Sequence, residues 1–256
     1  VIHFAAFSLV GESIENPVKY YKNNIRGSYN LFKAMVKNNV KRVVFSSTAA
    51  VYGNPERIPI KETDKKSPIN PYGLSKLTIE KILSNFDKKY GLKSVCLRYF
   101  NVIGADSKLR TGEWHNPETH LVPKVLKAII AKEKTFKVFG NNYKTKDGSC
   151  IRDYINVEDL IKAHILAYEY LKKENKSNVF NLGADSPKSV FDIVKMTKEL
   201  TNSDIEIEIA PNRPGDPDIL YADSSKAFKI LNWKPARKIE DSILSAYNWE
   251  LKNHLL

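Results

Sequence analysis

Tyr72 and Lys76 stand four residues apart in the stretch SPINPYGLSK, residues 67–76. Asn70 is a favoured helix N-cap and Pro71 a favoured first helical residue, so we expect a helix to begin here with both side chains on one face. A nearby ammonium and the positive end of a helix both favour the phenolate, which lowers a tyrosine pKa from its ordinary value of about 10. The spacing therefore predicts a phenol that acts as a general base. The plainer alternative is a ring that packs and a lysine that faces water.

A hydroxyl-rich segment, FSSTAAVYG at residues 45–53, precedes this helix. Ligands of open α/β sheets bind just outside the carboxyl ends of the strands. We therefore expect Ser47 or Thr48 to pass a proton between a substrate hydroxyl and Tyr72, although hydroxyls that only satisfy a turn would give the same pattern. Gly73 is costly inside a helix, and we expect it to let another group approach the backbone closely.

Apolar runs and periodic segments alternate along the first part of the chain. Strands are expected at residues 1–6, 41–47 and 94–100. Helices are expected at 17–38, where Pro17 follows the cap Asn16, and at 71–89. This alternation predicts a parallel α/β sheet.

The second part of the chain is more mixed, and residues 105–120, rich in Gly, Pro and polar residues, are the expected hinge into a second lobe. The strictly alternating IEIEIA at 205–210 predicts a strand with one wet face. The other expected elements are strands at 137–140 and 179–183 and helices at 121–132, 157–171, 189–201 and 239–252.

Composition excludes several classes of protein. The chain has 256 residues with 42% hydrophobic content and contains no apolar run of the roughly 18 residues that a membrane span needs, so we expect no membrane partner. Its net charge is +12, but only eight of its 41 basic residues are Arg, and the lysines are dispersed. Readers of bases and phosphates rely on arginine, so we expect no nucleic-acid partner.

The cysteines and histidines suggest neither a disulfide framework nor a metal site. Cys96 and Cys150 are too few for a framework, which indicates a reducing, cytoplasmic setting. The five histidines are scattered, with no His/Cys cluster at metal-ligand spacing, so we expect no metal.

Taken in order, these motifs resemble the extended short-chain dehydrogenase/reductase family, and within it the UDP-glucose 4-epimerase (UDP-galactose 4-epimerase) family. The stretches that carry the resemblance are VIHFAAFSLVGESIENPVKYYKNN, FSSTAAVYG, NPYGLSK, LRYFNVIGA, ETHLVPKV, VFGNNYKTKDGSCIRDYINVEDL, VFNLG and RPGD. The resemblance implies a Rossmann-type, doubly wound parallel sheet with a smaller mixed α/β lobe. It further implies an NAD-binding domain at residues 1–104, to which 151–185 returns, and a nucleotide-sugar-binding domain at 105–256.

The chain departs from the family at its start. The family begins with a strand and a G-x-x-G-x-x-G loop whose backbone amides hold a pyrophosphate, and none of the 11 glycines of this chain forms such a loop. The opening VIHFAA matches the family's fourth strand. We therefore expect a sheet truncated at its N-terminus, and a chain that binds NAD poorly and is unstable and inactive when expressed alone.

The resemblance implies NAD-dependent 4-epimerisation of UDP-glucose and UDP-galactose through a transient 4-keto sugar. Ala49 and Ala50 stand where related 4,6-dehydratases carry acidic residues, which argues against dehydration. Epimerases of UDP-N-acetylhexosamines, pentoses or glucuronate remain open, since Leu220 holds a place that helps decide acceptance of an N-acetyl group. A non-catalytic dinucleotide-binding module is a further alternative, but it predicts a broken Tyr/Lys/Thr set.

Site residues follow from the resemblance, position by position. Tyr72, Lys76 and Thr48 would be catalytic and would also contact the cofactor. The other expected cofactor contacts are Phe4, Ala5, Ala6, Ser8, Asn23 and Phe100. The expected UDP-sugar contacts are Asn101, His120, Leu121, Phe139, Arg152, Arg213 and Asp216. The family also pairs the helices at 17–38 and 71–89 across a two-fold axis, so a homodimer is expected through apolar residues that include Tyr20, Leu31, Leu77 and Ile82.

Overall fold

The structure is a computed structural model that describes residues 1–212 and 217–254. The chain forms two compact units. The first contains Val1–Tyr99, Ile161–Leu182 and Ala222–Lys234, and the second contains Phe100–Leu160, Gly183–Tyr221 and Pro235–Leu256. Within the described residues, no helix combines the length and apolarity that crossing a membrane requires.

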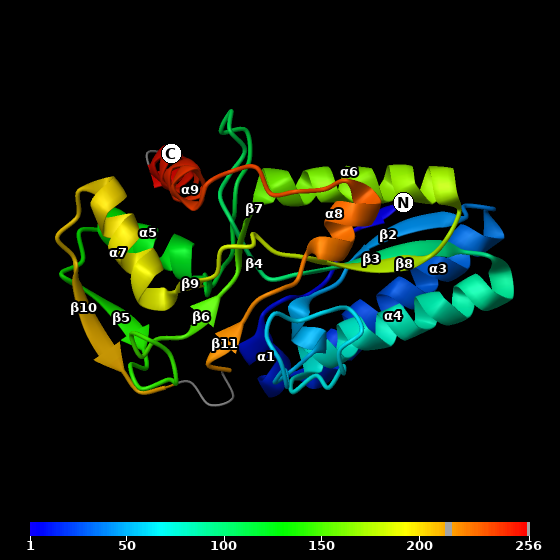
Figure 1. Cartoon of the computed structure of the whole chain (residues 1–256), viewed down its shortest axis with the longest axis horizontal. Coiled ribbons are helices and arrows are strands. Elements are labelled where there is room, and N and C mark those ends of the chain that lie inside the picture. The colour runs from blue at the N-terminus through cyan, green and yellow to red at the C-terminus, as the bar shows by residue number, and fades with distance from the viewer. Residues whose placement is uncertain (213–216, 255–256) are drawn as a thin grey trace. The chain divides into compact units, whose positions relative to one another are not determined.

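A parallel sheet forms the centre of the first unit (Figure 1). Its order is β1-β2-β3-β8, with β1 at Ile2–His3, β2 at Arg42–Ser46, β3 at Lys93–Tyr99 and β8 at Asn178–Leu182. All three strand pairs are parallel, as the alternation of apolar runs and helices predicted. The opening strand is shorter than the expected range 1–6, so the residues after His3 are free to form a loop.

Helices cover both faces of this sheet, which makes it doubly wound (Figure 1). Helices α3 (Gly27–Lys37) and α4 (Pro71–Tyr90) lie on one face, and α6 (Val157–Glu174) lies on the other. Burial of apolar side chains between α3, α4 and the sheet stabilises the unit. The buried residues of this core are Phe32, Met35, Val43, Phe45, Ile79, Leu83, Phe86, Leu92 and Cys96.

The helix expected at 17–38 is interrupted. Asn16 and Pro17 begin it as predicted, because the Asn16 side chain accepts a hydrogen bond from the amide of Lys19 at 3.2 Å. A short helix α2 (Pro17–Tyr20) then gives way to a π-helical turn, η1 (Tyr21–Arg26), before α3 begins. A further short helix, α1 (Val10–Glu15), precedes them and was not predicted.

Four side chains were expected to form a dimer surface, and the structure corrects two of them. Tyr20 is fully buried and donates hydrogen bonds to the carbonyl of Leu9 and to Glu12. Leu77 is also buried within the chain. Leu31 and Ile82 are half-buried against the core of the first unit. The prediction was wrong for Tyr20 and Leu77, because helical periodicity does not show which apolar side chains pack against the rest of the same chain.

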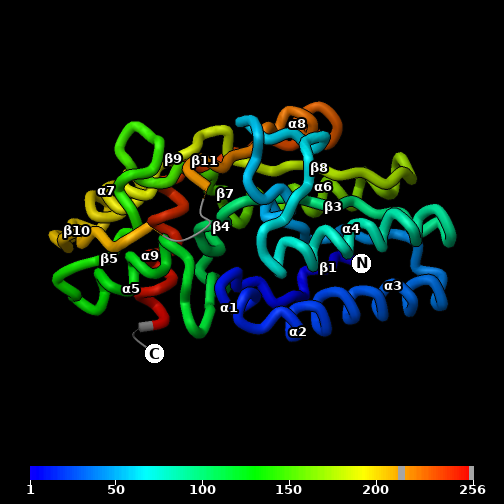
Figure 2. Tube along the Cα trace, turned by 90° about the horizontal axis from the view of Figure 1, so that it is seen from below, coloured from blue at the N-terminus to red at the C-terminus, as the bar shows by residue number. Residues whose placement is uncertain are grey.

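The second unit is mixed α/β, as the resemblance implied. Its strands pair as β4 (Asn101–Ile103) with β7 (Tyr154–Asn156) and β5 (Thr135–Phe139) with β10 (Glu206–Ala210). A third sheet has β6 (Ile151–Arg152) between β11 (Ile219–Leu220) and β9 (Lys188–Ser189). The helices α5 (Leu121–Ile130), α7 (Val190–Thr201) and α9 (Ile239–His254) pack on one another (Figure 2), and α5 also contacts β5. Strand β10 has no buried face, contrary to the prediction, since Ile207 and Ile209 are both exposed.

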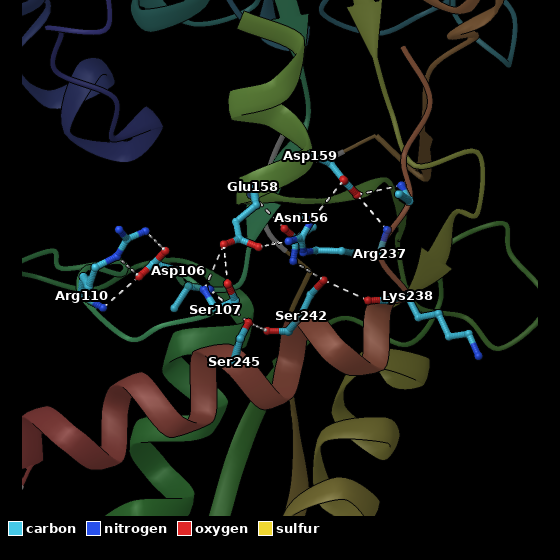
Figure 3. A network of polar contacts seen from close by, with 12 residues as sticks. Asp106, Ser107, Arg110, Asn156, Glu158, Asp159, Arg237, Lys238, Ser242 and Ser245 are labelled. Atoms are coloured by element: carbon cyan, nitrogen blue, oxygen red, sulfur yellow. Dashed lines mark hydrogen bonds and ion pairs between the residues drawn. The ribbon is translucent and has the colours of Figure 1, made fainter. Parts of the chain in front are cut away.

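A polar network joins three segments of the second unit (Figure 3). The buried carboxylate of Asp159, at the start of α6, accepts the backbone amides of Ala236 and Arg237, both at 2.9 Å. Glu158 accepts hydrogen bonds from the amide and the hydroxyl of Ser107 and forms an ion pair with Arg237. These bonds fix the loop that precedes α9.

Candidate active site

The first turn of α4 presents Tyr72, and local residues fix where that turn begins. The Asn70 side chain accepts a hydrogen bond from the amide of Gly73 at 2.8 Å, and Pro71 occupies the first helical position. Both features were predicted from the sequence. The tyrosine therefore lies in the first turn of α4, and its side chain is half-buried.

Gly73 brings α4 against the loop that follows β2. A Cβ atom at this position would lie 2.5 Å from the carbonyl oxygen of Ala50, closer than packed atoms approach. This close approach is the role that the sequence predicted for the glycine. It places the first turn of α4 directly beside the segment that carries Thr48.

Lys76 lies one turn further along α4 and is buried. Its ammonium donates a hydrogen bond from Nζ to the carbonyl oxygen of Ser46 at 2.8 Å. Nζ also lies 5.8 Å from the centre of the Tyr72 ring and 5.0 Å from that of Phe45. The tyrosine and the lysine thus share one face of α4, as predicted, and burial lowers the pKa of Lys76 to about 8.

The expected low pKa of the phenol is not found in the chain alone. The pKa of Tyr72 is raised above its ordinary value, chiefly by burial and then by neighbouring Tyr99, while a hydrogen bond with Thr48 acts in the opposite direction. The predicted lowering by Lys76 is not met in this structure: burial is the largest influence on this pKa, and the lysine ammonium donates to the backbone carbonyl of Ser46.

The structure also distinguishes Ser47 from Thr48; the residue pattern alone left both open, and the resemblance implied Thr48. The Ser47 hydroxyl donates to the buried carboxylate of Glu80 at 2.5 Å and therefore belongs to the interior. Thr48 caps the short helix Ala49–Val51 and forms the hydrogen bond with Tyr72. Thr48 is therefore the proton relay candidate.

A buried ion pair lies behind these residues, and sequence reasoning missed it. Arg98 donates to Glu80 from Nε at 2.9 Å and from Nη2 at 2.5 Å, and both side chains are buried. Arg98 also donates to the hydroxyl of Tyr52 at 2.8 Å, which in turn donates to Asn181 at 2.6 Å. The network joins α4, β3 and β8, and so holds the catalytic helix against the sheet.

The loop after β1 carries four expected cofactor contacts. Phe4, Ala5 and Ser8 are exposed and Ala6 is half-buried. These residues follow the carboxyl end of β1, as Ser47 and Thr48 follow the carboxyl end of β2. Because the two strands are parallel, both segments lie at the same edge of the sheet. That is where a dinucleotide binds in folds of this type.

Asn24 fixes this loop, a role that no sequence pattern indicated. Its side chain is buried, accepts the amide of Phe7 at 2.9 Å and donates to the carbonyl of Phe7 at 3.0 Å. It also donates to the hydroxyl of Ser75 on α4 at 3.2 Å. One amide group therefore ties the loop after β1 and the turn η1 to the helix that carries Tyr72 and Lys76.

Asn23, another expected cofactor contact, is exposed and lines an open pocket of about 660 Å³. Lys22 and Arg26 also line this pocket. Two cations and an amide suit a ligand that carries phosphate groups, because each can donate hydrogen bonds to phosphate oxygens. The residues present therefore fit a dinucleotide cofactor.

The expected substrate contacts in the described part of the second unit are scattered over several elements. Phe100, expected at the cofactor, and Asn101, expected at the substrate, stand at the start of this unit. The Asn101 side chain donates to the carbonyl of Asp153 at 3.3 Å. Phe139 ends β5 and is 37% exposed. Arg152 donates from Nη1 to the carbonyl of Ile151 at 2.9 Å.

The four other residues assigned to the sugar site have different outcomes. Leu121 packs, half-buried, against the core of the second unit, which is the structural alternative to a ligand contact. His120 turns its ring nitrogen Nδ1 toward Glu113, at 2.6 Å, and hydrogen bonds with Glu113 and then Glu118 raise its pKa to about 10. Arg213 and Asp216 lie outside the described residues.

The expectation of no metal-ligand cluster was wrong. Within the described residues, four side chains bring possible ligand atoms within 4.8 Å of one another: Glu113, His115, Glu118 and His120. The sequence signal was present as E-x-H-x-x-E-x-H, but it lies in the segment interpreted as a hinge.

Comparison with known proteins gives a consistent result. The family model described as GDP-mannose 4,6 dehydratase matches residues 1–245. The UDP-glucose 4-epimerase of Halalkalibacterium halodurans is 50% identical over 255 residues, which cover 99% of this chain and 76% of that protein. Many further curated proteins of the same name match at high coverage, among them that of Lactobacillus helveticus at 50% identity.

Solved structures agree with the fold. The crystal structure of UDP-glucose 4-epimerase from Brucella ovis in complex with NAD superposes with a TM-score of 0.92 at 42% identity, covering 97% of this chain and 77% of that one. The Bifidobacterium longum enzyme in complex with NAD+ and UDP gives a TM-score of 0.92 at 40% identity, covering 99% and 76%. The Rossmann-type fold expected from the sequence is thus confirmed.

Proposed function

The chain belongs to the UDP-glucose 4-epimerase family, within the wider family of the GDP-mannose 4,6 dehydratase model, and on this premise we propose that it is an NAD-dependent isomerase. It interconverts UDP-glucose and UDP-galactose through a transient 4-keto sugar. The observation that carries the proposal is the set Thr48, Tyr72 and Lys76, gathered at the carboxyl end of β2 and the first turns of α4.

These three side chains handle the proton of the sugar 4-hydroxyl. NAD, when bound, supplies the redox chemistry by taking up and returning the hydride of the sugar C4. Tyr72 accepts the hydroxyl proton as a phenolate and becomes a neutral phenol, and Thr48, hydrogen-bonded to it, relays that proton. Because burial and neighbouring Tyr99 raise the pKa of Tyr72, its side chain becomes a base only when positive charge is brought to this site.

Lys76 contributes the chain's own positive charge on the tyrosine's face of α4. With a pKa of about 8, its amine is protonated at neutral pH, and burial keeps its charge unscreened by water. Its remaining N–H groups can donate to a cofactor hydroxyl while one N–H is held by Ser46. The amine thereby links the orientation of the cofactor to that of the phenol.

The division of labour between the units is part of the proposal. The first unit, with the loop after β1, Asn23 and the catalytic set, binds the dinucleotide. The second unit binds the nucleotide sugar, with Arg152 and Arg213 as bidentate donors to the diphosphate and Asp216 as acceptor for ribose hydroxyls. Asn101, Phe139 and the segment at His120 and Leu121 complete these proposed substrate contacts. Phe100 is proposed to contact the cofactor.

We also propose a homodimer that forms through α3 and α4. The support is the exposure of Tyr29 on α3, at 42%, and of Leu74 on α4, at 43%. Light scattering of the natural protein tests this, and a monomeric mass would contradict it. The proposed compartment is the cytoplasm, which keeps a thiol such as that of Cys96 reduced.

The experiment that tests the activity follows UDP-galactose by proton NMR in the presence of the natural full-length protein. Appearance of the UDP-glucose anomeric signal at equilibrium supports the proposal. UDP-N-acetylgalactosamine, UDP-arabinose and UDP-glucuronate are followed in parallel, because the family tolerates several sugars. Inversion of one of these with none of UDP-galactose would replace the proposed substrate, and formation of a stable keto product would indicate a dehydratase or dehydrogenase.

A further inference from the structure

Four side chains in the segment before α5 point their ligand atoms into one small space. The four donor atoms lie within 4.8 Å of one another. Nδ1 of His120 lies 2.6 Å from Oε1 of Glu113, and Nδ1 of His115 lies 3.2 Å from the same oxygen. In a tetrahedral zinc site with bonds of about 2 Å, donor atoms lie roughly 3.3 Å apart. The arrangement is therefore already near that of a four-coordinate site.

Glu118 provides an independent indication of a missing ligand. Its side chain is only 6% exposed, yet no hydrogen-bond donor among the described residues reaches its Oε2 atom. The other oxygen, Oε1, accepts the backbone amides of Thr119 and His120 at 2.7 and 2.8 Å, which fixes the carboxylate. Oε2 is thereby directed toward His115, whose Nδ1 lies 3.7 Å away. A buried carboxylate oxygen without a hydrogen-bond donor lowers the stability of the folded chain unless a cation binds it.

His115 shows the same feature. Its Nδ1 atom is buried and makes no hydrogen bond with a described residue, although Glu113 Oε1 is near. An imidazole nitrogen that faces two carboxylates can bind either a proton or a metal ion. The rings of His115 and His120 lie 5.0 Å apart, tilted by 56°, so both nitrogens can address one point between them.

Elements of the second unit fix both ends of this segment. The indole of Trp249 on α9 donates to the backbone carbonyl of Glu113 at 3.0 Å. His120 is the residue at which α5 begins. Helices α5 and α9 pack together through Val122, Leu126, Ile243 and Ala246 in one core. The ligands are therefore presented from a supported segment, which a metal site requires.

We propose a binding site for a divalent transition-metal ion of the zinc class, formed by Glu113, His115, Glu118 and His120. Two imidazoles and two carboxylates suit such an ion better than Mg²⁺ or Ca²⁺, which prefer oxygen ligands alone. Four protein ligands leave no open position, so the ion is structural rather than catalytic. It joins residues 113 and 120 across the segment that leads into α5. The two carboxylates balance its charge.

The test is calorimetric titration of Zn²⁺ into the natural full-length protein, prepared without a histidine tag and stripped with a chelator. Wild type is expected to bind one ion per chain, and His115→Asn and Glu118→Gln are each expected to weaken binding at least tenfold. Glu199→Gln is the matched control, because this residue is 65% exposed on α7 and lies outside the cluster. Circular dichroism of the metal-free variants checks that each is folded, and the half-exposed His115 keeps the test valid if Glu118→Gln does not fold.

Cobalt provides the second readout, because four-coordinate Co²⁺ absorbs visible light far more strongly than six-coordinate Co²⁺. A strong spectrum that is lost in His115→Asn supports the site. The proposal is overturned if wild type binds no Zn²⁺, if both variants bind as tightly as Glu199→Gln, or if excess Mg²⁺ displaces the ion. These measurements read metal binding alone, so they do not depend on the proposed epimerase activity.

Discussion

The ammonium of Lys76 donates a hydrogen bond to the carbonyl oxygen of Ser46 at 2.8 Å, and so joins the catalytic helix to the end of β2. This amine is buried, which lowers its pKa from 10.5 to about 8. A charged amine in a buried position reduces stability, and a buried, pKa-shifted amine beside Tyr72 is typical of a functional site.

Lys76→Met is expected to raise stability at neutral pH and to abolish turnover. The unfolded chain binds this proton more tightly than the folded one, so the buried amine costs stability below pH 8, and that cost disappears as pH rises from 8 to 10.5. The gain should be about 2 kcal/mol, because roughly 3 kcal/mol of burial cost is offset by about 1 kcal/mol for the lost hydrogen bond. Thermal unfolding of both proteins at pH 7 and pH 10 measures it. An advantage of the variant that grows with pH would contradict this explanation.

Breaking the Glu80–Arg98 pair should cost far more than breaking a surface pair. Their side chains are 8% and 4% exposed, so Glu80→Gln leaves a buried guanidinium without its counter-charge, at a cost of about 3–5 kcal/mol. Glu169→Gln removes an exposed pair with Lys172 and should cost no more than about 1 kcal/mol. Urea unfolding compares the two variants. Equal losses would show that the buried network does not hold α4 against the sheet.

Ser47 and Thr48 are neighbours in the sequence with different expected effects. Thr48→Val removes the hydroxyl that bonds Tyr72 and should lower kcat by about 10- to 100-fold, and loss of its cap on the helix Ala49–Val51 should cost about 1 kcal/mol of stability. Ser47→Ala removes a donor to Glu80 and should cost about 1–3 kcal/mol of stability while kcat changes only a few-fold. The reverse pattern would exchange the roles assigned to the two hydroxyls.

Gly73→Ala is expected to destabilise the protein although alanine is the better helix former. The added Cβ would lie 2.5 Å from the Ala50 carbonyl, and relieving that overlap should cost about 1–3 kcal/mol. Gly27→Ala is the matched control, because nothing lies within 4 Å of its Cβ and helix propensity alone should stabilise by up to about 1 kcal/mol. Denaturant unfolding of both variants decides the point, and the same sign of effect for both would contradict it.

The sequence was sufficient where local chemistry decides the structure. Asn70 and Pro71 fix the start of α4, and Asn16 and Pro17 the start of α2, because caps and prolines act on the residues beside them. Continuous apolar runs indicated parallel strands, because a strand covered by helices on both faces needs apolar side chains on both faces.

The sequence failed where distant residues decide. The Glu80–Arg98 pair and the bond from Asn24 to Ser75 join residues far apart in the chain, so no local pattern shows them. Burial likewise determines the pKa of Tyr72, and a four-residue spacing says nothing of burial.

The metal-ligand cluster was overlooked for a different reason. Its spacing was visible, but the surrounding Gly and Pro of residues 105–120 favoured a hinge.

The proposed mechanism depends most directly on the hydroxyl of Tyr72, and turnover of UDP-galactose by Tyr72→Phe tests it. The substitution removes one oxygen and keeps the ring, so UDP binding measured by calorimetry should match that of wild type. We predict that kcat falls by at least about 100-fold, because a general base contributes at least that much to the rate. A variant that folds, binds UDP and inverts C4 within a few-fold of the wild-type rate would contradict it.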